Sequence, residues 1–342
     1  MESETALNHP SHIKPVHMTR PNLPFLRHGL LIPLKAGFFF LALGLPLVSQ
    51  AALSINGFTA ATNDRYENDP SFVGNPYDWS GVGRSADGKW AVMISPNVFL
   101  SATHFHAADG ATLSFFPGND PGATPVTGVI SSSQQIGGTD LWIGALSSPL
   151  AGSIASYDFI TVPLTEASFT GSVLDNEFAY MSGVSQTVGG YGASPLTNQA
   201  VGTNRIEGFE EDLVVGASTG DSLLLVDNEI GDPAFTMTSF EAKVNGGDSG
   251  SPLMIVTGGN LTIAGIAWAT GTVDIDPAEE TEVNRGVSAY TYVGNHTSEI
   301  VSFLGANPVP EPSTWGMILL VAPAFICRRR RSQSAAPTDL RR

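Results

Sequence analysis

The sequence GGDSGSP at residues 246–252 runs directly into the apolar segment LMIV at 253–256. Glycines on both sides of Ser249 allow the backbone to turn sharply and to come close to a substrate carbonyl group. In such a turn the amide groups of Gly247 and Ser249 can point at one place, where an oxyanion develops. Because a serine hydroxyl alone is a poor nucleophile, this stretch predicts a reactive serine only if the chain also supplies a base and a group that orients the base.

Two upstream segments supply candidates for these roles. His104, the candidate base, lies just after the apolar segment 98–102, which follows a Ser-Pro-Asn turn. Asp140, the candidate acid, precedes the apolar segment 141–146, and an aspartate at the mouth of a strand can be buried beside a histidine, where it orients the imidazole. His106 competes with His104 as the base, but the register after LSAT favours His104. Other carboxylates are interpreted as loop residues: Asp109, Asp120 and Asp158.

Three motifs together resemble those of trypsin-like (chymotrypsin-fold, S1-type) serine proteases: FLSATHF at 99–105, DLWIGALSSPL at 140–150 and GGDSGSPLMI at 246–255. The order His, Asp, Ser agrees with this family, and the separations are 36 and 109 residues. Thr103 stands where these proteases more often carry alanine, and Phe105 where they carry cysteine. A different serine-hydrolase motif, Gly-x-Ser-x-Gly, does not fit, because Ser251 occupies its final glycine position and its triad has another chain order.

The resemblance spans roughly residues 55–305 and implies both a fold and a site. The implied fold is all-β, with two six-stranded antiparallel β-barrels and a short C-terminal helix. The implied site is a catalytic triad of His104, Asp140 and Ser249, with an oxyanion hole formed by the amides of Gly247 and Ser249. It requires no cofactor and no metal.

The residues themselves also favour an all-β protein. From Trp90 onward, short apolar runs alternate with clusters of Gly, Ser, Asn and Pro, as is typical of barrels and sandwiches. Helical periodicity is sustained only at 297–304, where Thr297 can cap a helix and Gly305 can end it. We expect residues 53–85 to wrap the surface before the first barrel, and the two barrels to divide near 165–175.

The resemblance also places specificity residues. It puts the floor of the primary specificity pocket six residues before the nucleophile, at Lys243. If Lys243 faces the pocket, we expect no cleavage after Lys or Arg and a preference for Glu or Asp. If it faces solvent instead, another residue such as Glu241 forms the floor. The far wall is expected from the strand that pairs with substrate, with Thr270 narrowing the entrance: Ala267, Trp268, Ala269 and Thr270.

Activation is a further expectation from the resemblance. In trypsin-like zymogens a new N-terminal amine often pairs with the aspartate before the nucleophile, which is Asp248 here. No Arg-Ile-Val-Gly-Gly-like junction is present. Three routes stay open: signal cleavage, a cut near Arg65, or a different partner for Asp248.

The N-terminal residues 1–51 predict a secretory signal with a long basic leader. An apolar run at 36–48 follows four basic residues, and Ser49 and Ala51 supply the small residues that a signal peptidase reads. A membrane anchor is disfavoured, because the run is short and Pro46 interrupts it.

The C-terminus carries a second predicted targeting signal. Pro-Glu-Pro at 310–312 precedes 13 apolar residues at 315–327 and four arginines at 328–331. This pattern, at 309–332, resembles the PEP-CTERM sorting signal that exosortase recognises in Gram-negative bacteria, and a disordered tail at 333–342 follows it. A permanent tail anchor is disfavoured, because 13 residues are short for a span. We therefore expect contact with exosortase and the secretion machinery, only transient contact with the membrane, and loss of the tail.

The region between the signals is strongly acidic. The chain has 16 basic and 32 acidic residues, of which 10 basic and 3 acidic residues lie outside 52–312. Residues 52–312 therefore hold 6 basic and 29 acidic residues, a net charge near −23. Phosphate groups attract the opposite charge, so nucleic acid and anionic membrane are not expected partners. The acidic segment 274–280 could bind Ca²⁺, but solvated surface charge is the favoured interpretation.

Cysteine is absent from the predicted protease domain at 52–308. The only cysteine of the chain is Cys327. The domain therefore has neither a disulfide nor a cysteine-ligated zinc site. About 250 residues bury a sufficient core without such crosslinks.

These observations predict a secreted, surface-sorted serine endopeptidase that acts as a monomer on protein or peptide substrates. Two alternatives stay open. One is a non-catalytic trypsin-like matrix or binding protein of the extracellular polysaccharide layer, and the other is an esterase that uses the same triad. Retention of all three triad residues favours catalysis, and the chain order favours the protease fold.

Overall fold

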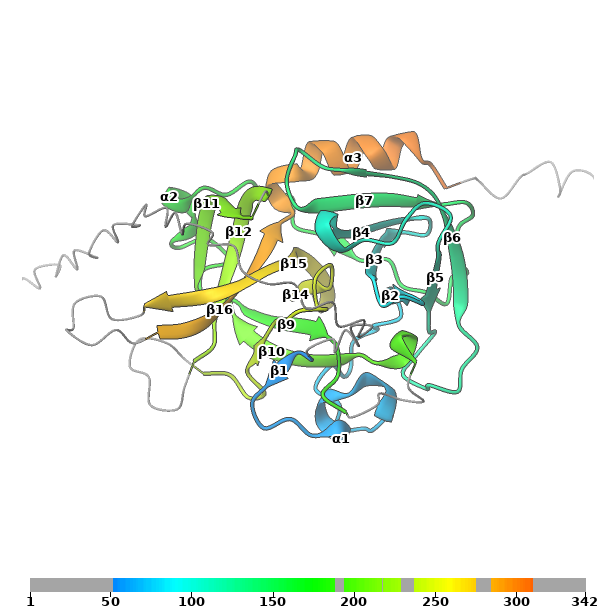
Figure 1. The fold of residues 1–342 in the computed structure, drawn as a ribbon, viewed down its shortest axis with the longest axis horizontal. Helices are drawn as coiled ribbons and strands as arrows, with labels where there is room; N and C mark the ends of the chain where they lie inside the picture. The colour runs from blue at the N-terminus through cyan, green and yellow to red at the C-terminus, as the bar shows by residue number, and fades with distance from the viewer. Residues whose placement is uncertain (1–51, 188–193, 217, 229–236, 275–283, 310–342) are drawn as a thin grey trace, which may run out of the picture.

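A computed structural model describes residues 52–187, 194–216, 218–228, 237–274 and 284–309 (Figure 1). The predicted export signal at 1–51, the sorting signal from residue 310 onward and the tail at 333–342 lie outside the described residues. So does most of the acidic segment considered for calcium. Within the described parts of the chain, no helix is long and apolar enough to cross a membrane.

The first structural unit is a closed antiparallel barrel with the strand order β2-β3-β4-β7-β6-β5. Its strands are β2 (Val82–Ser85), β3 (Trp90–Ser95), β4 (Val98–Ala102), β5 (Thr112–Phe115), β6 (Val126–Gln135) and β7 (Leu141–Leu146). The run WAVMI in β3 is apolar at every position because both faces of this strand are buried. Ala91 and Met93 belong to the barrel's own core, whereas Trp90, Val92 and Ile94 belong to a core shared with the second unit.

The second unit is a curved sheet whose main path runs β10-β9-β14-β15-β16-β12-β11. Its strands are β9 (Phe178–Gly183), β10 (Ala200–Arg205), β11 (Gly208–Val215), β12 (Ser218–Val226), β14 (Pro252–Thr257), β15 (Asn260–Asp274) and β16 (Asn284–Tyr292). An eighth strand, β8 (Asp158–Phe159), pairs in parallel with β15. Figure 1 shows this sheet beside the barrel, with the long β15–β16 hairpin extending away from it.

The predicted all-β class is confirmed, with one difference in the second unit. The first barrel has the six strands expected, whereas the second unit is a half-barrel sheet of eight strands. The connection between the units runs from the end of β7 at Leu146 to the start of β8 at Asp158. The range 165–175, where a boundary was expected, lies later in the chain, between β8 and β9, and contains the four-residue helix α2 (Glu166–Phe169).

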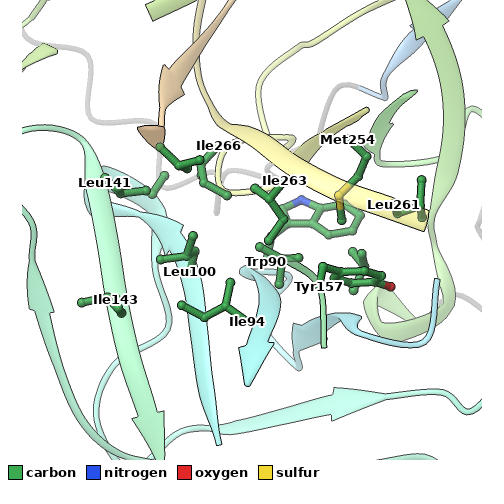
Figure 2. Close-up of a cluster of buried hydrophobic side chains, with 14 of the residues drawn as sticks. Trp90, Ile94, Leu100, Leu141, Ile143, Tyr157, Met254, Leu261, Ile263 and Ile266 are labelled. Atoms are coloured by element: carbon green, nitrogen blue, oxygen red, sulfur yellow. The ribbon is translucent and has the colours of Figure 1, made fainter. Parts of the chain in front are cut away.

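One apolar core joins the two units. It contains residues of β3, β4 and β7 from the barrel together with residues of β14 and β15 from the sheet. Figure 2 shows Trp90, Leu100 and Leu141 facing Met254 and Ile266 across this core. Buried apolar packing of this kind is close-packed and stiff, so it fixes the barrel and the sheet relative to each other.

The segment before the barrel is more deeply anchored than the sequence predicted. β1 (Ser54–Ile55) pairs with β13 (Ala242–Lys243), and helix α1 (Ala60–Asn63) and the 3₁₀ turn η1 (Arg65–Glu67) follow. The expectation that 53–85 only wraps the surface is therefore wrong. Its apolar residues are isolated in the sequence and show no periodicity, yet five of them are at most 2% exposed: Leu53, Tyr66, Phe72, Trp79 and Val82.

The C-terminal helix α3 (Thr297–Ala306) lies along the barrel (Figure 1). Its predicted ends shift slightly. Thr297 is the first helical residue rather than the cap, and its hydroxyl donates to the carbonyl of Gly294 at 2.8 Å within the 3₁₀ turn η5 (Gly294–His296). Gly305 lies inside the helix, which ends at Ala306. Another 3₁₀ turn, η4 (Pro195–Thr197), packs near β2.

Candidate active site

His104 is positioned by the β3–β4 hairpin that the sequence predicted. β4 ends at Ala102, and the 3₁₀ turn η2 (Thr103–Phe105) carries the imidazole away from the barrel core. The Thr103 amide donates to the backbone carbonyl of Asp140 at 2.7 Å, and the His104 amide donates to Asp140 Oδ1 at 3.1 Å. The two segments are therefore held together by one backbone–backbone hydrogen bond and one bond from a backbone amide to the Asp140 carboxylate.

His104, Asp140 and Ser249 come together in one hydrogen-bonded row. His104 Nδ1 lies 2.7 Å from Asp140 Oδ2, and His104 Nε2 lies 2.9 Å from Ser249 Oγ. The Asp140 side chain is fully buried, whereas the His104 side chain is 43% exposed. An imidazole protonated on Nδ1 donates to the carboxylate and leaves Nε2 to accept the serine proton, which is the arrangement that nucleophilic catalysis by serine requires.

His106, the competing base, lies elsewhere. Its ring stacks on Trp142, with 3.8 Å between ring centroids and 20° between planes. Its Nδ1 donates to the carbonyl of Thr103 at 2.6 Å. The other nearby carboxylates are also in different settings: Asp109 accepts from Ser133, Asp120 accepts from Gly122, and Asp158 is in β8.

The loop that carries Ser249 is clamped against the barrel. Gly247 and Gly250 have φ of +100° and +89°, which only glycine adopts without strain. The Trp90 indole donates from Nε1 to the Gly247 carbonyl at 2.9 Å, and the Gly250 amide donates to the Ala267 carbonyl at 2.8 Å. A Cβ at Gly250 would lie 3.0 Å from Ser101 Oγ, so the barrel approaches the loop as closely as glycine allows.

The amides expected to form the oxyanion hole are available. Among the described residues, neither the Gly247 amide nor the Ser249 amide donates a hydrogen bond to protein. The intervening Asp248 amide is used differently, since it donates to the Asn245 carbonyl at 3.1 Å and closes the turn. Unpaired amides on either side of this turn are what an oxyanion site needs.

Asp248 is buried beneath the nucleophile loop. Its Oδ1 accepts the Val184 amide at 2.7 Å and its Oδ2 accepts the Asn245 amide at 2.8 Å. Burial raises the pKa of this carboxyl to about 7, against the lowering effect of these two amides and of Arg84. Asp248 therefore has hydrogen-bond partners other than an N-terminal amine, as the third of the activation routes considered requires.

Arg65, considered as an activation cut, is fully buried. Its guanidinium donates to the carbonyls of Val82, Phe116 and Gly118 at 2.9–3.2 Å, and to side chains on Gln199 and Asn119. A protease cannot reach the bond beside such a residue without unfolding the surrounding structure. A cut near Arg65 would therefore have to fall at exposed neighbours such as Glu67 and Asn68.

A cavity of about 80 Å³ opens beside Ser249. The predicted wall residues Ala267, Trp268, Ala269 and Thr270 all line it, and so do three residues that sequence reasoning did not select: Val244, Asn245 and Gly246. Trp268 lies at a β-bulge in β15, where the register with β16 shifts.

Lys243 does not belong to this cavity, which corrects the expectation that it forms the floor. Its Nζ lies 3.1 Å from Asp227 Oδ2. β13 ends at Lys243, and the next residue, Val244, lines the cavity while Lys243 does not. Glu241 is not the floor either, because its carboxylate is buried and accepts the amides of Asn228 and Thr238 at 2.6 Å each.

Trp90, outside the three motifs, and Ser101, within the motif at 99–105, are supporting residues whose roles the sequence did not indicate. Trp90 fixes the Gly247 carbonyl, and the Ser101 hydroxyl donates to the Trp90 carbonyl at 2.8 Å. A buried indole N–H needs a hydrogen-bond acceptor, and this general requirement is the only signal in the sequence that points to a role for Trp90. Within the described chain, no group of three or more His, Cys, Asp or Glu is placed to hold a metal ion.

Comparison with known proteins adds little to this description. No protein-family model matches the sequence, and no curated protein matches it. Among solved structures, the chain is similar to the NS6 protease from murine norovirus 1, at 16% sequence identity and a TM-score of 0.36, covering 63% of this chain and 90% of that one. The fold is assigned from its own strand topology: the closed antiparallel barrel, the half-barrel sheet and the short C-terminal helix are those of the chymotrypsin-like fold.

Proposed function

We propose that this protein is a serine peptidase in which Ser249 is the nucleophile, His104 the general base and Asp140 the residue that orients it. The observation that carries the proposal is the continuous row of hydrogen bonds from Asp140 Oδ2 through the His104 ring to Ser249 Oγ, at 2.7 and 2.9 Å. Free amides at Gly247 and Ser249 beside the nucleophile support it.

The reaction follows from these positions. Ser249 Oγ attacks the carbonyl carbon of the substrate while His104 Nε2 takes the hydroxyl proton, and Asp140 stabilises the imidazolium that forms. The Gly247 and Ser249 amides donate to the oxyanion, which contributes roughly 3 kcal/mol per donor to the transition state. His104 then protonates the leaving amine, an acyl-enzyme remains on Ser249, and a water activated by His104 releases the acid.

Hydrolysis of an unstructured protein tests this proposal. We expect release of new amino termini by the protein comprising residues 52–308, and loss of this activity in Ser249→Ala. A parallel assay with p-nitrophenyl acetate separates the esterase alternative. Turnover of the ester together with no peptide-bond cleavage would show an esterase, and turnover of neither would show a non-catalytic protein.

We further propose that the protein is exported and sorted to the cell surface or extracellular matrix, and that its C-terminal tail is removed there. The support is the apolar run at 36–48 and the Pro-Glu-Pro, apolar and arginine pattern at 310–331. Intact-mass measurement of surface material tests this step. Protein that still carries the four arginines at 328–331 would contradict it.

A further inference from the structure

The cavity beside Ser249 lies where the side chain before the cleaved bond must go. The attacked carbonyl carbon is bonded directly to the α-carbon of its own residue, so that side chain starts within a few ångströms of Ser249 Oγ. The cavity includes Ser249 in its lining and is bordered by Gly246 of the nucleophile loop and by Ala267–Ala269 of β15. A substrate preference of this cavity rests on the proposed function, because the cavity belongs to that same site.

The volume of the cavity limits the side chain that it accepts. It measures about 80 Å³. An engineered apolar cavity of roughly 150 Å³ binds benzene, so this space is about half of what an aromatic ring needs. Side chains of one to three heavy atoms fit it, whereas a benzyl group or a long Lys or Arg side chain does not.

The chemistry of the lining excludes charge. None of the described residues that line the cavity is ionisable. The nearest lysine in sequence, Lys243, pairs with Asp227 outside the cavity. The Asn245 amide group is directed at the N-terminal segment, because its Nδ2 donates to the Ala52 carbonyl at 2.6 Å and to Ser54 Oγ at 2.9 Å. A charged side chain placed here would lose its hydration without gaining a partner, so its binding is disfavoured.

Val244 is the largest aliphatic residue that lines the cavity. It is 3% exposed and packs in the core of the sheet, and its amide donates to Ser288 Oγ at 3.0 Å, which fixes its place. Ala267 and Ala269 are already small, so Val244 is the wall residue whose shortening adds space without breaking the β-bulge at Trp268.

We propose that this cavity selects a small, uncharged side chain, such as that of Ala, Val or Thr, immediately before the cleaved bond, and that Val244 sets its upper size limit. The preference for Glu or Asp that Lys243 suggested is replaced by a preference set by size and apolarity.

The test is a panel of tetrapeptide p-nitroanilides that differ only in the last residue: Ala, Val, Leu, Phe, Lys and Glu. Each enzyme sample is first titrated with a fluorophosphonate, so that rates refer to active molecules only. We expect kcat/KM for Ala and Val to exceed that for Phe, Lys and Glu at least about tenfold, since even one methylene changes such ratios by about 10-fold or more.

Three variants make the test specific to the cavity. Val244→Ala should raise the Leu-to-Ala ratio of kcat/KM about tenfold, and Ala269→Val should lower the Val-to-Ala ratio by a similar factor. Lys243→Ala is the matched control, because this residue adjoins Val244 but does not line the cavity, and it should leave all ratios unchanged.

The outcomes separate this inference from the proposed function. If the fluorophosphonate titrates all of the enzyme but cleavage is preferred after Phe, Lys or Glu, the inference is overturned and the peptidase proposal stays intact. The same holds if Lys243→Ala, rather than Val244→Ala, changes the ratios. A protein that is not titrated at all would contradict the proposed function and the inference with it.

Discussion

Two histidines only two residues apart have different settings, and the difference lies in what each ring nitrogen contacts. His104 has a carboxylate at Nδ1 and a serine hydroxyl at Nε2, whereas His106 has a backbone carbonyl at Nδ1 and its face against Trp142. A general base must lie within hydrogen-bond reach of the proton that it abstracts. Only His104 meets this condition for Ser249.

This contrast gives a first prediction. Ser249→Ala and Asp140→Asn should each lower kcat by about 10⁴-fold or more, because one removes the nucleophile and the other the acceptor that fixes the imidazole tautomer. His106→Ala is the matched control and should retain kcat within a few-fold. Steady-state kinetics on one peptide substrate, with circular dichroism to verify folding, measure all three. Comparable losses in His106→Ala and Asp140→Asn would be evidence against the assigned base.

Asp248 is the second residue whose environment has a measurable consequence. Burial raises the pKa of its carboxyl from 3.8 to about 7 in the folded protein. Between these values the folded state holds a proton that the unfolded state has released. The contribution of Asp248 to the free energy of unfolding is therefore fully present below pH 3.8 and is lost as pH rises through about 7.

Urea unfolding at several pH values between 5 and 8 measures this effect. The free energy of unfolding should fall with pH more steeply in the natural protein than in Asp248→Asn, by at most about 1.4 kcal/mol per pH unit. The variant lacks this ionisable carboxyl, so its pH slope gives the contribution of all the other titratable groups. Equal pH slopes in the two proteins would show that Asp248 is ionised in the fold over the whole range.

At the scale of elements, the N-terminal segment is tied to the segments that support the nucleophile loop. β1 pairs with β13, and the Leu53 amide donates to the Val184 carbonyl at 2.9 Å. Val184 in turn donates its own amide to Asp248. Residues 53–55 are therefore linked through Val184 to Asp248 in the loop that carries Ser249.

Leu53→Ala tests how much this attachment contributes. Leu53 is fully buried in the core of the sheet, and shortening a buried leucine to alanine costs about 2–5 kcal/mol. Val173→Ala, at a residue that is 75% exposed, should change the free energy of unfolding by no more than about 0.5 kcal/mol. Denaturant unfolding followed by tryptophan fluorescence compares them. A loss below 1 kcal/mol in Leu53→Ala would mean that the segment is not part of the folded core.

Some elements were readable from the sequence and others were not, for physical reasons. The apolar runs that became β3, β4, β7 and β14 are continuous, so they predict buried strands directly. The direction of Lys243 stayed open because a shift of one residue in a strand reverses every side chain, and nothing in the sequence of this loop fixes its register. The anchoring of 53–85 was missed because single buried residues such as Leu53 and Trp79 leave no periodic signal.

At the scale of the whole molecule, the site exists only because two units are held together. His104 and Asp140 come from the barrel and Ser249 from the loop before β14, while Trp90 of the barrel fixes the Gly247 carbonyl. The shared apolar core beneath them, between β3, β4, β7 and β14, β15, keeps these distances (Figure 2). Motif order predicted which residues meet, whereas the half-barrel form of the second unit depends on long-range strand pairing that local patterns do not record.

The most direct test of this account is to find which atom reacts with a fluorophosphonate. Peptide mapping by mass spectrometry after labelling should locate one adduct per chain, on Ser249, and Asp140→Asn should slow its formation. Ser251 is an internal control, because it lies two residues away but is fully buried. An adduct on Ser251 or any other residue, or no adduct on a folded protein, would contradict the assignment of Ser249 as the nucleophile.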